Sequence, residues 1–333
     1  MTASPTAPPP NSVAVVSGGV GAARFLRGLI EAIDPSRIVA VVNTGDDTTM
    51  HGLSISPDLD TITYTLAGAI DPERGWGLAD ETWRAIGALE RYEAVRPEGS
   101  GAAARWFNLG DQDLATHFYR TARLREGASL TEVTDEITRA WSLPIRIVPM
   151  SDDRLATLVT VESDDGGPGD EVSFQDYFVR LRHSVPVTSV RFAGDARPSD
   201  VASTALRDAS AVVIAPSNPL VSIGPIRSLS GVDESLTDRR ESVVGVSPIV
   251  GGAALKGPAD RMLTELGHRA DAVGVARLYA PIAASLVIDE VDAHLADDVS
   301  AEGVRPVVAD TIMSRPGVAR SLALTTLSAA GVG

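Results

Sequence analysis

Acidic residues recur in two short segments of this chain, and each segment has the residue types of a metal site. The first runs from Asn43 to Asp47 and the second from Ser56 to Thr61. Neighbouring carboxylates suit a hard divalent cation such as Mg²⁺, so we expect Asp46, Asp47 and Asp60 to hold one. The alternative is that these aspartates only form turns or cap a helix, because aspartate is common at both positions.

A glycine-rich turn, Gly18-Gly19-Val20-Gly21, stands between an apolar run and a segment with helical spacing. Such a turn directs backbone N–H groups and a helix N-terminus at one point, which favours an anion. We expect Gly18, Gly19 and Gly21 to bind phosphate, with Arg24 adding positive charge; a tight turn without a ligand is the alternative. Arg24 also replaces the third glycine of a dinucleotide fingerprint, and there is no Walker A sequence.

Two later loops carry groups that suit a nucleotide. The first contains Ser217, Asn218 and Ser222, whose neutral donors and acceptors favour recognition of a base edge or a ribose. The second contains Lys256, the only lysine in the chain. A compact ammonium would neutralise a phosphate or a developing negative charge there; an ordinary surface lysine is the alternative.

The segment from Trp106 to His117 has the composition of a helix start. Asn108 is either a cap or a ligand contact, and the aromatic pair before it is either core or a platform for a flat ligand. His117 has the spacing to face the same site, although a buried histidine with protein partners fits equally well.

Apolar runs that end in Gly, Pro, Ser, Asn or Asp predict the elements that position these groups. They are typical of buried parallel strands with a ligand crevice at their C-terminal ends. We therefore expect an α/β fold with a Rossmann-like, mainly parallel sheet. Strands are expected at 13–17, 38–42, 211–215, 242–246, 272–275, 285–288 and 304–308, and helices at 22–33, 61–67, 80–92, 109–123 and 130–141.

The chain is expected to form one domain over 13–330, preceded by a disordered tail at 1–12. Residues from about 60 to 200 are expected to form a helical insertion with a small β element, packed over the crevice. Neither a secretory signal nor a membrane-spanning apolar run is visible, so we expect a cytoplasmic protein.

Composition excludes several classes of function. The 333 residues include no cysteine, which excludes disulfides, thiolate metal sites and a cysteine nucleophile. The formal net charge of −15 argues against a nucleic-acid partner, because no broad cationic field is present. A small phosphorylated ligand needs only a local site and stays compatible with this charge.

Taken together, these segments resemble the 2-phospho-L-lactate transferases of deazaflavin coenzyme biosynthesis, including the actinobacterial phosphoenolpyruvate transferases. Several separate motifs in order carry the resemblance, and no single one would suffice. They are Ser17–Gly21, Asn43–Asp47, Ser56–Thr61, Asn108–Asp111, Pro149–Asp153, Ala215–Ile226, Ser247–Ala259 and Ala309–Met313.

The resemblance implies transfer of an enolpyruvyl-phosphate or 2-phospholactyl group from its guanosine diphosphate adduct to a ribityl hydroxyl of the deazaflavin Fo. GMP leaves, and the product belongs to coenzyme F-420 biosynthesis. Family members use Mg²⁺ and are typically dimers. By matching position, Asp60 and Asn108 look like Fo contacts, and we add His117 to them. Family members often have lysine at the position of Asn108 and in the glycine turn at the position of Arg24.

Asp60, Asp47 and Lys256 are the expected catalytic residues, with Asp60 orienting or deprotonating the attacking hydroxyl. Two other classes of function fit the residues less well. A nicotinamide-dependent oxidoreductase would place Asp46 or Asp47 on a ribose, but the third glycine is missing. A non-catalytic guanine-nucleotide-binding regulator would have little use for so many carboxylates beside an anion site.

Overall fold

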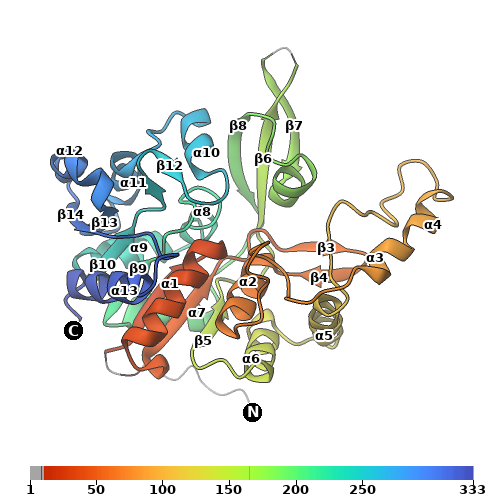
Figure 1. Cartoon of the computed structure of the whole chain (residues 1–333), viewed down its shortest axis with the longest axis horizontal. Coiled ribbons are helices and arrows are strands. Elements are labelled where there is room, and N and C mark those ends of the chain that lie inside the picture. The colour runs from red at the N-terminus through yellow and green to blue at the C-terminus, as the bar shows by residue number, and fades with distance from the viewer. Residues whose placement is uncertain (1–8, 10, 165, 333) are drawn as a thin grey trace.

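A seven-stranded parallel sheet forms the centre of the protein (Figure 1). The computed structural model describes residues 9, 11–164 and 166–332. Most of the expected tail at 1–12 lies outside these residues. Its last residue, Ser12, is buried and accepts a hydrogen bond from the Ser210 backbone N–H at 2.9 Å, so ordered structure begins before Val13.

The strand order is β14-β13-β10-β9-β1-β2-β5, and every neighbouring pair is parallel. The chain first builds outward from β1 to β2 and β5, then returns to the other side of β1 and continues from β9 to β14. This reversal makes the C-terminal ends of β1 and β9 a topological switch point, where open α/β sheets bind ligands. The strands are β1 (Val13–Ser17), β2 (Ile38–Val42), β5 (Arg146–Pro149), β9 (Ala211–Ile214), β10 (Val243–Val246), β13 (Ser285–Asp289) and β14 (Arg305–Ala309).

Helices cover both faces of the sheet, which is why its central strands consist almost entirely of buried apolar residues. Val13 and Val15 of β1 face one helical layer, and Ala14 and Val16 face the other. The first layer contains α1 (Gly19–Ala32), α2 (Pro57–Leu66) and α13 (Val318–Ala329). The second contains α7 (Asp200–Asp208), α8 (Gly224–Arg227), α9 (Val232–Asp238), α10 (Ala259–Glu265), α11 (Ala272–Tyr279) and α12 (Ala296–Ala301).

Two extensions project from this body (Figure 1). One is an antiparallel sheet of β6 (Ala156–Glu162), β7 (Pro168–Ser173) and β8 (Val187–Ala193), with a π-helical turn at Asp176–Arg180. The other contains the hairpin of β3 (Thr48–Met50) and β4 (Leu53–Ile55), together with α3 (Arg84–Ala88), α4 (Glu90–Glu93) and α5 (Asp113–Arg125). The remaining elements are α6 (Leu130–Ala140), β11 (Ile249–Val250), β12 (Ala253–Ala254) and 3-10 turns at Pro35–Arg37, Arg240–Ser242 and Glu290–Leu295.

The structure confirms the Rossmann-like class and corrects three local expectations. Residues 272–275 begin helix α11 rather than a strand; Asp271 caps this helix by accepting from the Gly274 N–H at 2.9 Å. Residues 80–92 contain only short helical turns. Strand β5 pairs with β2 in the main sheet, so 60–200 is not one uninterrupted insertion. No helix within the described residues is long and apolar enough to cross a membrane.

Candidate active site

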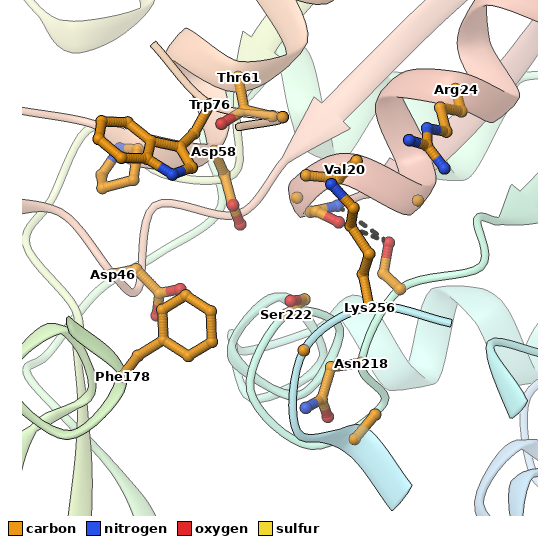
Figure 2. Close-up of a pocket in the computed structure, with 18 of the residues that line it drawn as sticks. Val20, Arg24, Asp46, Asp58, Thr61, Trp76, Phe178, Asn218, Ser222 and Lys256 are labelled. Atoms are coloured by element: carbon orange, nitrogen blue, oxygen red, sulfur yellow. Dashed lines mark hydrogen bonds between the residues drawn. The ribbon is translucent and has the colours of Figure 1, made fainter. Parts of the chain in front are cut away.

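A cavity of about 700 Å³ opens at the switch point, over the C-terminal ends of β1, β9 and β10 (Figure 2). Its wall is formed by the glycine turn, the start of α2, the loops after β2, β9, β10 and β14, and both extensions. The expected site residues that line it are Gly18, Gly19, Gly21, Arg24, Asp46, Asp60, Asn108, His117, Ser217, Asn218, Ser222 and Lys256. Asp47 is the exception.

The glycine turn brings the start of α1 to the cavity wall. Gly18 is the N-cap of this helix and offers no side chain to its first N–H groups. The Gly19 N–H donates to Asp58, and the N–H groups that follow it are available to an anion. A Cβ on Gly18 would lie 2.7 Å from the Ser222 Cβ, and one on Gly21 would overlap the Pro216 carbonyl. The glycines are therefore required for close packing between this turn and the loop after β9.

The loop after β9 places three polar side chains, Ser217, Asn218 and Ser222, in the cavity wall. The Ser217 hydroxyl donates to the Gly18 carbonyl at 2.7 Å and accepts from the Gly18 N–H at 3.3 Å. Asn218 Oδ1 accepts from the Leu220 N–H at 2.9 Å. Ser217 thus also holds the glycine turn in place, while the Asn218 and Ser222 side chains line the cavity (Figure 2).

Asp46 and Asp58 are buried carboxylates in the wall of the same cavity. Asn43 connects their segments: its Nδ2 donates to Asp58 Oδ2 at 2.9 Å, and its Oδ1 accepts from the Gly45 N–H at 2.8 Å. The Oδ1 atom of Asp46 is buried and has no hydrogen-bond partner among the described residues.

The two carboxylates lack a compensating positive charge. Burial, reinforced by the charge of Asp58, raises the pKa of Asp46 well above its usual value. Burial also raises the pKa of Asp58 to about 6, against the lowering effect of hydrogen bonds from Asn43 and Gly19. A divalent cation would relieve both effects. Mg²⁺ commonly uses one or two protein carboxylates, with water and substrate phosphates completing its shell, so this pair fits it.

The expected metal set of Asp46, Asp47 and Asp60 is not assembled. Asp47 lines a separate cavity of about 140 Å³, and its Oδ2 accepts from the Ser56 hydroxyl at 2.6 Å. Both oxygens of Asp60 are bound by Arg120. Within the described residues, no group of three or more histidine or acidic side chains is arranged to hold a metal ion. The structure instead favours Asp46 with Asp58, a residue that we did not select from the sequence.

Asp60 is held by a buried chain of polar residues under the cavity. Arg120, only 2% exposed, donates to Asp60 Oδ2 at 3.1 Å and also binds Oδ1. The same guanidinium lies 3.2 Å from His117 Nδ1, and Nε2 of that ring lies 3.3 Å from Asp113 Oδ2. The Tyr64 hydroxyl donates to Asp113 Oδ1 at 2.6 Å. Both nitrogens of His117 thus face protein groups.

In this buried network, the effect of charge pairing on the pKa values outweighs the effect of burial. Burial alone would lower the pKa of Arg120, but the charge of Asp60 and its hydrogen bonds raise it. Burial alone would raise the pKa of Asp113, but the interaction with His117 lowers it. The network therefore holds charged groups in place, and Asp60 enters the cavity wall in a fixed orientation.

Positive groups lie across the cavity from the aspartates. Figure 2 shows Lys256 extending toward Val20 in the first turn of α1, with Arg24 further along that helix. A Cβ on Gly75 would overlap Lys256 Nζ, so this exposed lysine rests against the backbone of the opposite loop. Asn108 is exposed at the rim.

Sequence reasoning missed an aromatic part of the wall. Trp76 and Phe178 line the cavity from opposite extensions (Figure 2). Of the pair considered as a platform, Phe107 lines the cavity, whereas Trp106 packs against the cluster around Leu109. The glycines on both sides of Trp76 were a signal in the sequence, since they allow the tight turn that presents it.

Comparison with known proteins agrees with the geometry. The model of the family 2-phospho-L-lactate transferase CofD matches residues 13–325. The phosphoenolpyruvate transferase of Streptomyces griseus is 41% identical over 88% of this chain and 90% of its own length. The enzyme of the same name from Nocardia farcinica is 39% identical over 96% of this chain and 95% of its own length.

A solved structure shares the fold. Protein BH3568 of Bacillus halodurans matches with a TM-score of 0.59 and 17% identity, over 95% of this chain and 99% of its own. At that identity the likeness concerns the fold alone, and it supports the α/β arrangement around the cavity.

Proposed function

We propose a reaction for this chain, which belongs to the 2-phospho-L-lactate transferase CofD family and is a transferase of coenzyme F-420 biosynthesis. The donor is the guanosine diphosphate whose outer phosphate carries the enolpyruvyl group, so that GMP and phosphoenolpyruvate share one bridging oxygen, and the acceptor is the ribityl hydroxyl of the deazaflavin Fo. The names of the actinobacterial relatives favour enolpyruvyl phosphate over the 2-phospholactyl group. GMP is the leaving group.

One observation supports this reaction above the others. The N-terminus of α1, whose Gly19 N–H donates to Asp58, and the buried pair of Asp46 and Asp58 border one cavity at the switch point of the sheet. The helix end suits phosphate, and the carboxylates suit the cation that accompanies a diphosphate. A simple anion-binding protein would gain nothing from two uncompensated carboxylates beside its ligand.

Mg²⁺ fits Asp46 and Asp58, because the Asp46 Oδ1 atom is buried without a partner and Asp58 lines the same wall. When bound there, the ion would neutralise charge on the diphosphate. The N–H groups of α1 would bind phosphate oxygens through backbone donors. The Asn218 amide and the Ser222 hydroxyl would contact the nucleoside part of the donor.

The transfer itself requires positioning more than strong acid or base chemistry. The acceptor oxygen forms a new bond to the phosphorus that carries enolpyruvate. The bond from that phosphorus to the bridging oxygen breaks, and GMP leaves with the bridging oxygen. Asp60, whose orientation Arg120 fixes, accepts a hydrogen bond from the attacking hydroxyl and receives its proton. Lys256 and Arg24 stabilise the negative charge that develops.

The test uses purified protein with Fo, Mg²⁺ and the guanylyl diphosphate adducts of phosphoenolpyruvate and of lactate. Mass spectrometry should detect the dehydro form of the phosphodiester product and GMP from the first adduct. Product from the lactyl adduct alone would overturn the choice of donor. A folded protein that binds Fo but makes no product from either adduct would contradict the proposed reaction.

The Asp60→Asn variant separates the role of Asp60 from binding of the donor. It keeps the size of the side chain but cannot take a proton, so turnover should fall at least tenfold while GMP still binds. Because the change also weakens the pairing with Arg120, activity is measured below the melting temperature of the variant, where circular dichroism shows it to be folded. Asp135→Asn, an exposed change on α6, is the matched control and should keep full activity.

A further inference from the structure

Trp76 stands out among the residues of the cavity wall that the proposed reaction does not use. It is 41% exposed, although tryptophan is the largest apolar side chain, and it borders the cavity. The tip of a tight loop carries it between Gly75 (φ +73°) and Gly77 (φ +66°). Both glycines adopt a left-handed backbone that other residues rarely adopt.

The loop that carries Trp76 is held rigidly. Its two sides are joined by a hydrogen bond from the Asp71 N–H to the Gly77 carbonyl at 3.1 Å and by a β-bridge between Ile70 and Leu78. The Asp71 carboxylate accepts from the Arg74 N–H at 2.9 Å and pairs with the guanidinium of that residue at 2.8 Å. The backbone that carries Trp76 therefore has little freedom to rearrange when a ligand enters.

The Trp76 indole packs against one cation and one other ring among the described residues. The Arg74 guanidinium lies 5.5 Å from the Trp76 ring centre and 5.3 Å from that of Trp83, and the two ring centres are 6.0 Å apart. Three points at such similar separations form a nearly equal-sided triangle. Seen from the Trp76 ring centre, Arg74 and Trp83 therefore lie in similar directions, and the Trp76 side chain also borders the cavity.

The other exposed ring of the wall packs differently. Phe178 stacks on Phe174 with ring centres 5.6 Å apart and on His183 with ring centres 5.4 Å apart. Its faces are thus engaged within the β6–β8 extension. Trp76 is the better candidate for stacking on a flat ligand, since its ring contact with Trp83 is tilted by 57° rather than stacked.

We propose that Trp76 is the platform on which the flat heteroaromatic ring system of the acceptor stacks, with Arg74 and Trp83 holding the indole in place. The proposal rests on the proposed function, because that function supplies an acceptor with such a ring. Lys256 Nζ adjoins the backbone of Gly75, one residue before the platform. A ring on Trp76 would therefore lie next to the positive group that is assigned to the transferred phosphate.

Two substitutions distinguish stacking from simple apolar contact. Trp76→Phe keeps an aromatic face, whereas Trp76→Leu keeps apolar bulk without one. Loss of a ring stack is expected to weaken binding about 5- to 150-fold. The KM for Fo should therefore rise at least fivefold in Trp76→Leu and less than about threefold in Trp76→Phe, while the KM for the donor stays unchanged. Equal values in both variants would overturn the stacking role.

A binding measurement separates this proposal from the proposed function. Riboflavin has a flat three-ring system with a ribityl chain, so it serves as a ligand that needs no turnover. Quenching of tryptophan fluorescence by riboflavin should be strong in the wild type and in Trp141→Leu, whose altered ring lies outside the cavity wall, and largely lost in Trp76→Leu. Loss of the same size in both variants would contradict the platform even if the transferase reaction is confirmed.

Discussion

The pairing of Arg120 with Asp60 leads to a prediction about stability. Arg120→Met keeps most of the length of the side chain but removes the group that binds both oxygens of Asp60. The guanidinium is 2% exposed and Asp60 is 6% exposed, so water cannot replace the lost contacts. Breaking a buried ion pair from one side costs about 3–5 kcal/mol, because a buried charge is left without a partner.

The expected shift in melting temperature follows from the length of the chain. Unfolding entropy is about 2.1 cal/mol/K per residue, which for 333 residues gives about 0.7 kcal/mol/K. A loss of 4 kcal/mol should then lower the melting temperature by about 6 °C. The double variant Arg120→Met/Asp60→Asn should recover part of this loss, since it removes the unpaired charge as well.

Thermal unfolding followed by circular dichroism measures these shifts. Arg139→Met is the matched control, because Arg139 pairs with Asp135 on α6 with side chains 70% and 61% exposed. An exposed pair of this kind contributes less than about 1 kcal/mol, so the control should melt within about 1–2 °C of the wild type. If Arg120→Met melts at the temperature of the control, the buried pair does not stabilise the fold and the reasoning is wrong.

Three more predictions concern the acidic groups and the glycine turn. The pKa of Asp58 is raised from 3.8 to about 6 and that of Asp47 to about 8, so the native state binds protons more tightly than the unfolded chain. The melting temperature of metal-free protein should therefore fall as the pH rises from 4 to 8. In Asp58→Asn, the fall in melting temperature between pH 4 and pH 6 should be smaller. Adding Mg²⁺ at pH 8 should raise the melting temperature, and Asp46→Asn but not Asp47→Asn should abolish this rise; an unchanged response in Asp46→Asn would exclude the assigned pair. Gly21→Ala should cost about 1–3 kcal/mol of stability and weaken GMP binding measured by calorimetry, because its methyl group would overlap the Pro216 carbonyl.

The parallel sheet was predictable because its strands are buried on both faces. Runs such as 13–17 and 38–42 contain no polar residue before their last position, which is a clear signal of a central strand. The same signal failed at 272–275, because a helix buried on all sides has no polar stripe and resembles a buried strand. Strand β5 was missed since it has only four residues and begins with the exposed Arg146.

The candidate site was only partly predictable, because the sequence does not show in which direction a side chain points. The spacing of the motifs placed Asp46, Asp47, Asp58 and Asp60 near one another, and the structure does bring their segments together. Sequence does not show which way a side chain points within a turn, so Asp47 was assigned to a cavity that it does not line. The pairing of Asp60 with Arg120 could not be predicted either, because Arg120 lies 60 residues further along the chain. The sequence of its helix is typical of an ordinary surface helix.

The charge of the site explains how an acidic protein can bind an anionic donor. A chain with a net charge of −15 repels a diphosphate over most of its surface, and Asp46 and Asp58 add to this repulsion inside the cavity. The free N–H groups of α1 supply only a partial positive charge, which cannot balance two carboxylates and a diphosphate. A divalent cation bound with the donor would balance them, and its binding would become favourable only when both the carboxylates and the phosphates are present. Donor and cation should therefore bind cooperatively, because each reduces the repulsion that the other meets from Asp46 and Asp58.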